Sequence, residues 1–213
     1  MDQAFFLLID LMDWAEPAAI FGAIMAYIWS FRYSYPWSIA LIVLAVVFSH
    51  VWRRERPSEI GFRRDNFLKC AEWLAPPSAL LALLLVAGGF LLHTIRPIRF
   101  DLGLAGWALY LPWGVAQQYM LNGYFLRRLE KASPHRAAPA IASVLFSLAH
   151  LPNWFLMAIT LGGGLLCTHL YRRIPNLYVL GLIHGTIGFA LYLVVPDSIS
   201  HHLRVGQGWY SWR

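Results

Sequence analysis

The stretch Gln117-Gln118-Tyr119-Met120-Leu121-Asn122-Gly123-Tyr124-Phe125-Leu126-Arg127-Arg128 decides how this chain folds. It ends a segment, residues 103–129, that contains no Asp or Glu and is apolar enough to enter a lipid bilayer. Polar side chains at membrane depth are costly, and they usually face the interior of a helical bundle. On an α-helix Gln118 and Asn122 share a face, because they are four residues apart. The stretch therefore predicts a membrane helix whose polar face is turned towards other helices.

The composition is that of an integral membrane protein. Of the 213 residues, 59% are hydrophobic and 13% are charged, whereas soluble domains contain about 25% charged residues. A span takes roughly 20 apolar residues, and we expect about seven of them. They are predicted at residues 14–31, 36–52, 75–95, 104–126, 138–152, 155–171 and 177–195. The predicted fold is an all-α, polytopic helical bundle formed by one membrane domain, residues 1–213.

The basic residues indicate how this bundle is oriented. Twelve of the 17 Lys and Arg residues follow the second, fourth and sixth predicted spans, in the loops 53–69, 127–136 and 172–173. Such an excess is typical of cytoplasmic loops. The pattern predicts a cytoplasmic N-terminus and an outer C-terminus, with residues 196–213 as a tail on the outer face. It also assigns the net charge of +6 to membrane topology, and we expect no nucleic-acid partner.

Two further apolar segments each contain one histidine, in the sequences Phe146-Ser147-Leu148-Ala149-His150 and Ile183-His184-Gly185-Thr186-Ile187-Gly188. Helical spacing places Phe146 beside His150. It also puts Gly188 one turn after His184, where the missing side chain leaves room beside the imidazole. Between these segments, Gly162-Gly163-Gly164 is expected to let helices pack closely.

These three polar motifs resemble those of the CAAX-processing and bacteriocin-processing (CPBP) family of intramembrane proteases, which includes the type II CAAX prenyl endopeptidases. In that family the first motif reads Glu-Glu-x-x-x-Arg and the second reads Phe-x-x-x-His. The last is a His followed, usually, by Asn four residues on. The resemblance covers residues 53–195. It implies an all-helical bundle whose site opens towards the membrane, where one Glu and two His activate water for peptide-bond hydrolysis, with or without a metal.

The resemblance implies a site shared by three helices, in which Gln118, Asn122, His150 and His184 line one polar cavity. The positions implied as catalytic are His150, His184, Gln117, Gln118 and Asn122, and those implied to contact a substrate or partner are Phe146 and Gly188. Phe146, His150 and His184 match the family motifs. At the other positions Gln117 and Gln118 replace the Glu pair, Asn122 replaces the Arg, and Gly188 replaces the Asn.

The missing carboxylates determine the predicted chemistry. A carboxylate can take a proton from water, whereas a carboxamide has no titratable site near neutral pH and can only orient water or stabilise an oxyanion. We therefore predict impaired proteolysis. Two routes to hydrolysis stay open: His150 could act as the base, or His150 and His184 could hold one divalent metal such as zinc. Catalytic zinc, however, usually takes three protein ligands.

Three functions are compatible with these motifs. The first is a CPBP-like protein that acts on or holds a membrane peptide or a prenylated or processed protein. The second is a non-catalytic membrane binding or assembly module with the same fold. The third is a haem- or pigment-binding membrane protein with His150 and His184 as axial ligands, although neither cysteine has a CxxCH context. We expect the partners to be a membrane protein or peptide and the lipid bilayer, and the location to be a bacterial inner membrane.

Overall fold

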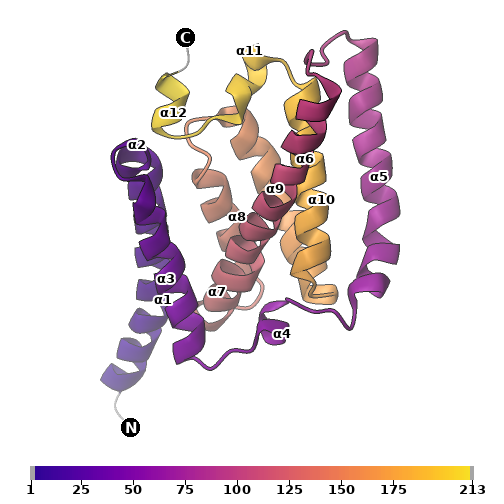
Figure 1. Cartoon of the computed structure of the whole chain (residues 1–213). Helices are drawn as coiled ribbons and strands as arrows, with labels where there is room; N and C mark the ends of the chain where they lie inside the picture. The colour runs from indigo at the N-terminus through magenta and orange to yellow at the C-terminus, as the bar shows by residue number, and fades with distance from the viewer. Residues whose placement is uncertain (1–2, 212–213) are drawn as a thin grey trace. The chain divides into compact units, whose positions relative to one another are not determined.

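A computed structural model describes residues 3–211 of the chain, with side chains from residue 13 onwards (Figure 1). Throughout this described range every regular element is a helix and no strand occurs, so the predicted all-α class is confirmed. The chain divides into two compact units, each assembled from segments that are distant in sequence. The first unit comprises Met1–Arg56, Leu121–Thr168 and Val205–Arg213, and the second comprises Pro57–Met120 and His169–Arg204.

The first unit is built around helices from both ends of its sequence. Its elements are α1 (Gln3–Ala26), the π-helix η1 (Tyr27–Phe31), α2 (Arg32–Ser34), the 3₁₀ helix η2 (Pro36–Ser38), α3 (Ile39–Trp52), most of the π-helix η3 (Tyr119–Leu126), α7 (Arg127–Ala132), α8 (Ala138–Leu148), most of α9 (Trp154–Arg173) and α12 (Gln207–Tyr210). Helix α1 lies beside α3 and also packs against α7 (Figure 1). Of the three consecutive glycines expected to allow close packing, only Gly164 does so. A Cβ there would lie 3.1 Å from the Cβ of Ser143, whereas Gly162 and Gly163 have nothing within 4 Å.

The second unit has α10 (Leu177–Val194) at its centre, packed against α6 (Phe100–Gln118) and α5 (Phe67–Leu91) (Figure 1). Its other elements are α4 (Pro57–Ile60), α11 (Asp197–Ser200) and the 3₁₀ helix η4 (His201–Leu203). Glycines permit the close approach of α6 and α10. A Cβ on Gly114 would lie 2.3 Å from the carbonyl oxygen of Gly181, and one on Gly185 would lie 2.4 Å from that of Tyr110. No larger residue fits at this crossing without moving a helix.

The surface of the helices is that of a membrane protein. Among the residues described, three helices are long and apolar enough to cross a bilayer: α5, α9 and α10. Large apolar side chains on α5 are exposed, among them Leu83, Phe90 and Leu91. Contiguous exposed apolar surface of this kind marks contact with lipid or a partner. The chain is therefore an integral membrane protein. Helices α3 and α8, with 14 and 11 residues, are shorter than the roughly 20 residues of a typical span, and the total of about seven spans stays a prediction.

A polar loop fixes the start of α10 in the second unit. The side chain of Asn176 caps this helix by accepting a hydrogen bond from the Val179 amide at 3.0 Å. Its amide group donates to the Arg63 carbonyl at 2.8 Å, and the Leu177 amide donates to the Gly61 carbonyl at 2.8 Å. Gly61 has a φ of +105°, a conformation that residues other than glycine rarely adopt. These contacts join the connector before α5 to the start of α10.

Candidate functional site

The stretch from Gln117 to Arg128 contains a change of helix type. Gln118 is the last residue of α6, and the π-helix η3 follows directly and contains Asn122. Short π-helical segments are rare and are frequent at functional sites. Both side chains are buried, with exposures of 1% and 0%. The shared face of Gln118 and Asn122 was predicted for a regular α-helix. The pitch changes between the two residues and they belong to different units, so it stays a prediction.

In the second unit Gln118 is paired with His184, one of the predicted site histidines. The Gln118 side-chain nitrogen lies 2.9 Å from Nδ1 of His184. Because a carboxamide NH₂ group can only donate, Nδ1 is the acceptor in this arrangement, and the ring proton is on Nε2. The glycine contacts between α6 and α10 bring the two side chains together. The structure thus joins two of the predicted site residues in one hydrogen bond.

In the first unit Phe146 and His150 are neighbours, as their spacing predicts. Their ring centroids are 5.0 Å apart with an interplanar angle of 73°, an edge-to-face arrangement. Nδ1 of His150 donates to the Phe146 carbonyl oxygen at 2.7 Å. This bond leaves the lone pair on Nε2 of a ring that is only 9% exposed. His150 is therefore held in one tautomer, with its Nε2 able to accept a proton or a hydrogen bond.

The two remaining predicted positions have plainer surroundings. Gln117 is half-buried, unlike its neighbour Gln118. A Cβ on Gly188 would lie 3.5 Å from the ring of Tyr110, so part of the space next to this glycine is occupied by an aromatic side chain. Within the units the structure pairs Gln118 with His184 and Phe146 with His150. The convergence of residues from both units on one cavity stays a prediction.

A buried charged cluster in the first unit was not predicted from the sequence. At its centre lies Arg128, which is 2% exposed. Its Nη2 lies 2.7 Å from Oε2 of Glu55, and its Nε lies 3.0 Å from Oε1 of Glu16. Glu55 also binds Arg127 at 2.9 Å, and Glu16 binds Arg53 at 2.5 Å. We call these five residues the charged cluster; they link α1, α7 and the residues that follow α3.

Three uncharged or weakly basic side chains complete the hydrogen bonding of the charged cluster. The Tyr124 hydroxyl donates to Oε1 of Glu16 at 3.1 Å. Ser49 donates to the same carboxylate and accepts from Nη2 of Arg128 at 2.9 Å. Nδ1 of His50 donates to Oε2 of Glu55 at 2.6 Å. Tyr124 lies in η3, so the cluster also holds the π-helix that contains Asn122.

The environment of Glu55 keeps this carboxyl group ionised. Burial by itself raises its pKa, but the hydrogen bonds from Arg128, Arg127 and His50 outweigh burial and hold the pKa well below its usual range. Removing a single partner of such a buried pair leaves an uncompensated charge, which is strongly destabilising. The charged cluster therefore stabilises the packing of the first unit, and its carboxylates already form ion pairs with arginines.

The sequence contains a pattern of charges that indicates this cluster, although its basic residues were interpreted as a topology signal. The basic residues after the second and fourth predicted spans were assigned to membrane topology. Arg53, Arg127 and Arg128 are balanced by Glu16 and Glu55, two carboxylates that also lie near the ends of apolar segments. Opposite charges at matching ends of several spans were the available signal.

The residues present do not make a zinc site of the usual kind. Among the described residues no group of three or more His, Cys, Asp or Glu side chains is placed to hold a metal ion. The Nδ1 atom of His184 already accepts a hydrogen bond from Gln118, and a carboxamide oxygen is a poor third ligand for zinc. The donor set does not fit the predicted metal, and no step proposed below passes through one.

The structure is that of a helical membrane protein with an amide–imidazole hydrogen bond among its apolar helices. A family model described as "Type II CAAX prenyl endopeptidase Rce1-like" matches residues 99–190. This match supports the membership of the CPBP family that the motifs predicted. The matched segment contains every motif position from Gln117 to Gly188, while residues 53–98 of the predicted core lie outside it. No curated protein and no solved structure matches the chain.

Proposed function

We propose that this CPBP-family protein holds a membrane peptide in the site where active members of the family cleave one, and that it cleaves poorly or not at all. The observation that carries the proposal is the hydrogen bond from the Gln118 amide to Nδ1 of His184. It joins two motif positions of the family, and an amide stands at the position where the family motif has a Glu.

This replacement changes what the histidine can do. A carboxylate next to Nδ1 accepts a hydrogen bond from the N–H group at Nδ1. It also stabilises the imidazolium that forms when Nε2 takes a proton. The Gln118 NH₂ group instead requires a bare Nδ1, so a protonated His184 would lose this hydrogen bond. Gln118 also has no titratable site with which to take a proton from water. The pair therefore favours a neutral, fixed histidine over a proton carrier.

A neutral pair of histidines is well suited to binding a peptide. With Nδ1 as acceptor, His184 carries its ring proton on Nε2, and His150 carries its lone pair on Nε2 because its Nδ1 donates to the Phe146 carbonyl. A peptide bond offers one carbonyl acceptor and one N–H donor. Each unit thus contributes one neutral imidazole to the proposed peptide binding at membrane depth, where unsatisfied polar groups of a peptide are costly.

The test is a cleavage and binding assay on the full chain in proteoliposomes, using fluorogenic membrane peptides with and without a prenyl group. We expect binding without cleavage above background for the wild type, and weaker binding for His150→Ala. The double change Gln117→Glu and Gln118→Glu restores the carboxylates, and any gain of hydrolysis in that variant would support the proposal. Robust cleavage by the wild type, abolished in His150→Ala, would show instead that the protein is an active peptidase with a base other than a carboxylate.

We further propose the predicted topology of about seven spans, with the N-terminus in the cytoplasm and the C-terminus outside, in a bacterial inner membrane. Contacts within each unit support it. Glu55 in the first basic loop binds Arg127 in the second, and the Gly61 carbonyl accepts from Leu177 next to the third. On the side predicted to be outside, Arg96 binds Asp197 and the Val195 carbonyl. A cysteine introduced at Ser133 should resist labelling from the outer side, and labelling there would refute this orientation.

A further inference from the structure

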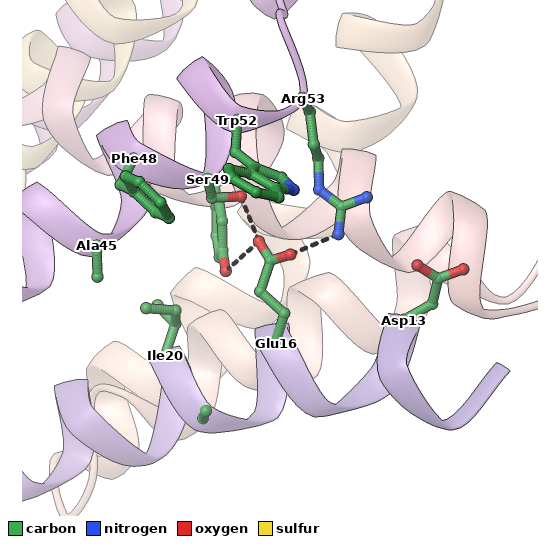
Figure 2. Close-up of a pocket in the computed structure, with 10 residues that line it drawn as sticks. Asp13, Glu16, Ile20, Ala45, Phe48, Ser49, Trp52 and Arg53 are labelled. Atoms are coloured by element: carbon green, nitrogen blue, oxygen red, sulfur yellow. Dashed lines mark hydrogen bonds and ion pairs between the residues drawn. The ribbon is translucent and has the colours of Figure 1, made fainter. Parts of the chain in front are cut away.

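A pocket of about 780 Å³ lies between α1 and α3 of the first unit (Figure 2). Its volume falls within the ~300–1,000 Å³ of typical small-molecule sites. One end is charged, with Asp13 and Arg53, and the other is apolar, with Ile20, Ala45 and Phe48. The pocket contains none of the predicted site residues, so it needs an explanation of its own.

The sequence spacing makes this pocket a slot parallel to the helices. On α3, Ala45, Phe48 and Trp52 recur every three or four residues and so share one face. Asp13 lies level with Arg53, and Ile20 lies towards Ala45, so the two helices run in opposite directions along the slot (Figure 2). Seven residues of α-helix rise about 10 Å. The slot therefore leads from a charged end to an apolar end along two predicted spans.

The charges at its polar end are only partly balanced. Glu16 lines the pocket but is engaged by Arg53 at 2.5 Å and by Ser49 (Figure 2). Asp13 is different: among residues with described side chains, none forms a hydrogen bond or ion pair with it. The neighbouring Trp52 is 77% exposed. The polar end thus offers a carboxylate that forms no ion pair with any described side chain, together with an aromatic ring and a guanidinium group.

We propose that this pocket binds a single phospholipid with an ammonium headgroup, such as phosphatidylethanolamine. The ammonium would lie between the Asp13 carboxylate and the ring of Trp52, since cations are attracted to both. The phosphate would contact Arg53, whose fork of N–H groups suits phosphate oxygens. One acyl chain would run along Ile20, Ala45 and Phe48. An anionic lipid without an ammonium group would place its headgroup beside the unbalanced carboxylate, which disfavours it.

The position of the pocket along the chain agrees with such a lipid. Residue 52 ends the second predicted span and residue 53 follows it, at the level where tryptophan and arginine side chains gather at a membrane surface. Ala45 and Ile20 lie further into the predicted spans. A headgroup at Asp13 and a chain at Ala45 therefore match the expected direction of a lipid in the cytoplasmic leaflet.

The test is native mass spectrometry of the full chain released from nanodiscs that contain equal amounts of phosphatidylethanolamine and phosphatidylglycerol with identical acyl chains. We expect one retained phosphatidylethanolamine molecule per chain. Asp13→Asn should reduce the preference for it roughly fivefold to tenfold, the effect of one charge-assisted hydrogen bond. The matched control is Asp101→Asn, an exposed aspartate paired with Arg99 outside the pocket. It should behave like the wild type.

A second pair of variants tests the ring and guards against misfolding. Trp52→Leu should lower retention of phosphatidylethanolamine, whereas Trp73→Leu, at a site that is 67% exposed on α5, should not. All variants are compared only if they elute as one species with an unchanged helical circular-dichroism spectrum. Equal retention of the two lipids by the wild type, or an unchanged preference in both Asp13→Asn and Trp52→Leu, would overturn the proposal. Cross-linking that shows a second copy of the chain covering Phe48 would overturn it as well.

Discussion

The charged cluster of the first unit and the Gln118–His184 pair of the second solve the same problem in different ways. Both place polar side chains in the interior of a membrane protein. In the charged cluster, two glutamates face three arginines, and Arg128 alone binds both carboxylates. In the second unit the contact joins a neutral amide to an imidazole. A buried charge is tolerated when it is paired and hydrogen-bonded, and a neutral hydrogen bond avoids most of its desolvation cost.

This difference shows that the buried carboxylates of the first unit have a structural role. Glu16 and Glu55 serve architecture, because arginines and hydrogen bonds occupy them from several sides. At the family's catalytic positions the corresponding groups are amides. We infer that the first unit depends on its charges for stability, whereas the second depends on helix packing and on neutral hydrogen bonds. Four substitution experiments follow from this contrast, taken from the largest expected effect to the smallest.

Arg128→Met should cause the largest loss of stability. It removes the cation shared by Glu16 and Glu55, and losing one partner of a buried ion pair costs about 3–5 kcal/mol. Thermal unfolding of the detergent-solubilised protein measures the effect. Arg99→Met is the control, because Arg99 forms an exposed pair with Asp101 and such pairs are worth about 1 kcal/mol or less. Equal melting temperatures for the two variants would mean that the charged cluster does not stabilise the fold.

Gly114→Ala should be the next most damaging change and should act on the second unit. The added Cβ would lie 2.3 Å from the Gly181 carbonyl oxygen, so α6 and α10 must separate. Overpacking of this kind costs about 1–3 kcal/mol, occasionally more. Gly162→Ala is the matched control: nothing lies within 4 Å of its added Cβ, and alanine is the better helix former. A variant at Gly114 as stable as the one at Gly162 would contradict the tight crossing.

Gln118→Leu should have a smaller effect on unfolding than either of these. It removes one neutral hydrogen bond and leaves Nδ1 of His184 without this partner, a loss of about 1–2 kcal/mol. The adjacent Gln117→Leu serves as control, since Gln117 is half-buried whereas Gln118 is 1% exposed. The unfolding curves of both variants are measured under the same conditions and compared. A larger loss of stability in Gln117→Leu than in Gln118→Leu would mean that the Gln118–His184 hydrogen bond contributes little to stability.

The smallest expected effect is a dependence on pH that separates the two regions. The pKa of Glu55 is held below its usual range, so its contribution to stability is complete above the unfolded-state pKa of about 4.3. It declines as pH falls from there towards the lower folded-state pKa, by no more than about 1.4 kcal/mol per pH unit. The gap in melting temperature between wild type and Glu55→Gln should therefore narrow below about pH 4. Any change in the gap between wild type and Gln118→Leu should instead accompany protonation of His184, which breaks this hydrogen bond. A gap for Glu55→Gln that stays constant below about pH 4 would contradict the role given to Glu55.

The sequence by itself determined the all-α membrane class and the resemblance to the CPBP family. Long apolar runs must satisfy their backbone hydrogen bonds locally in lipid, which leaves helices as the solution. The resemblance rests on three short motifs, because their spacing is local and is kept although Gln replaces Glu at positions 117 and 118. The neighbouring rings of Phe146 and His150 were predictable for the same reason, since residues four apart on one helix meet without help from the rest of the fold.

Only the tertiary structure decided which distant residues meet. Glu16 and Arg128 are 112 residues apart, and Glu55 and Arg128 are 73 apart. No local periodicity reports such a pairing, because it depends on which helix faces α1 and α7. The contact between Gly114 and Gly181 likewise depends on how α6 crosses α10, while the conspicuous glycines at 162 and 163 face open space. Local sequence patterns determine which segments form helices. The packing of those helices determines which polar groups form contacts and which glycines lie at helix crossings.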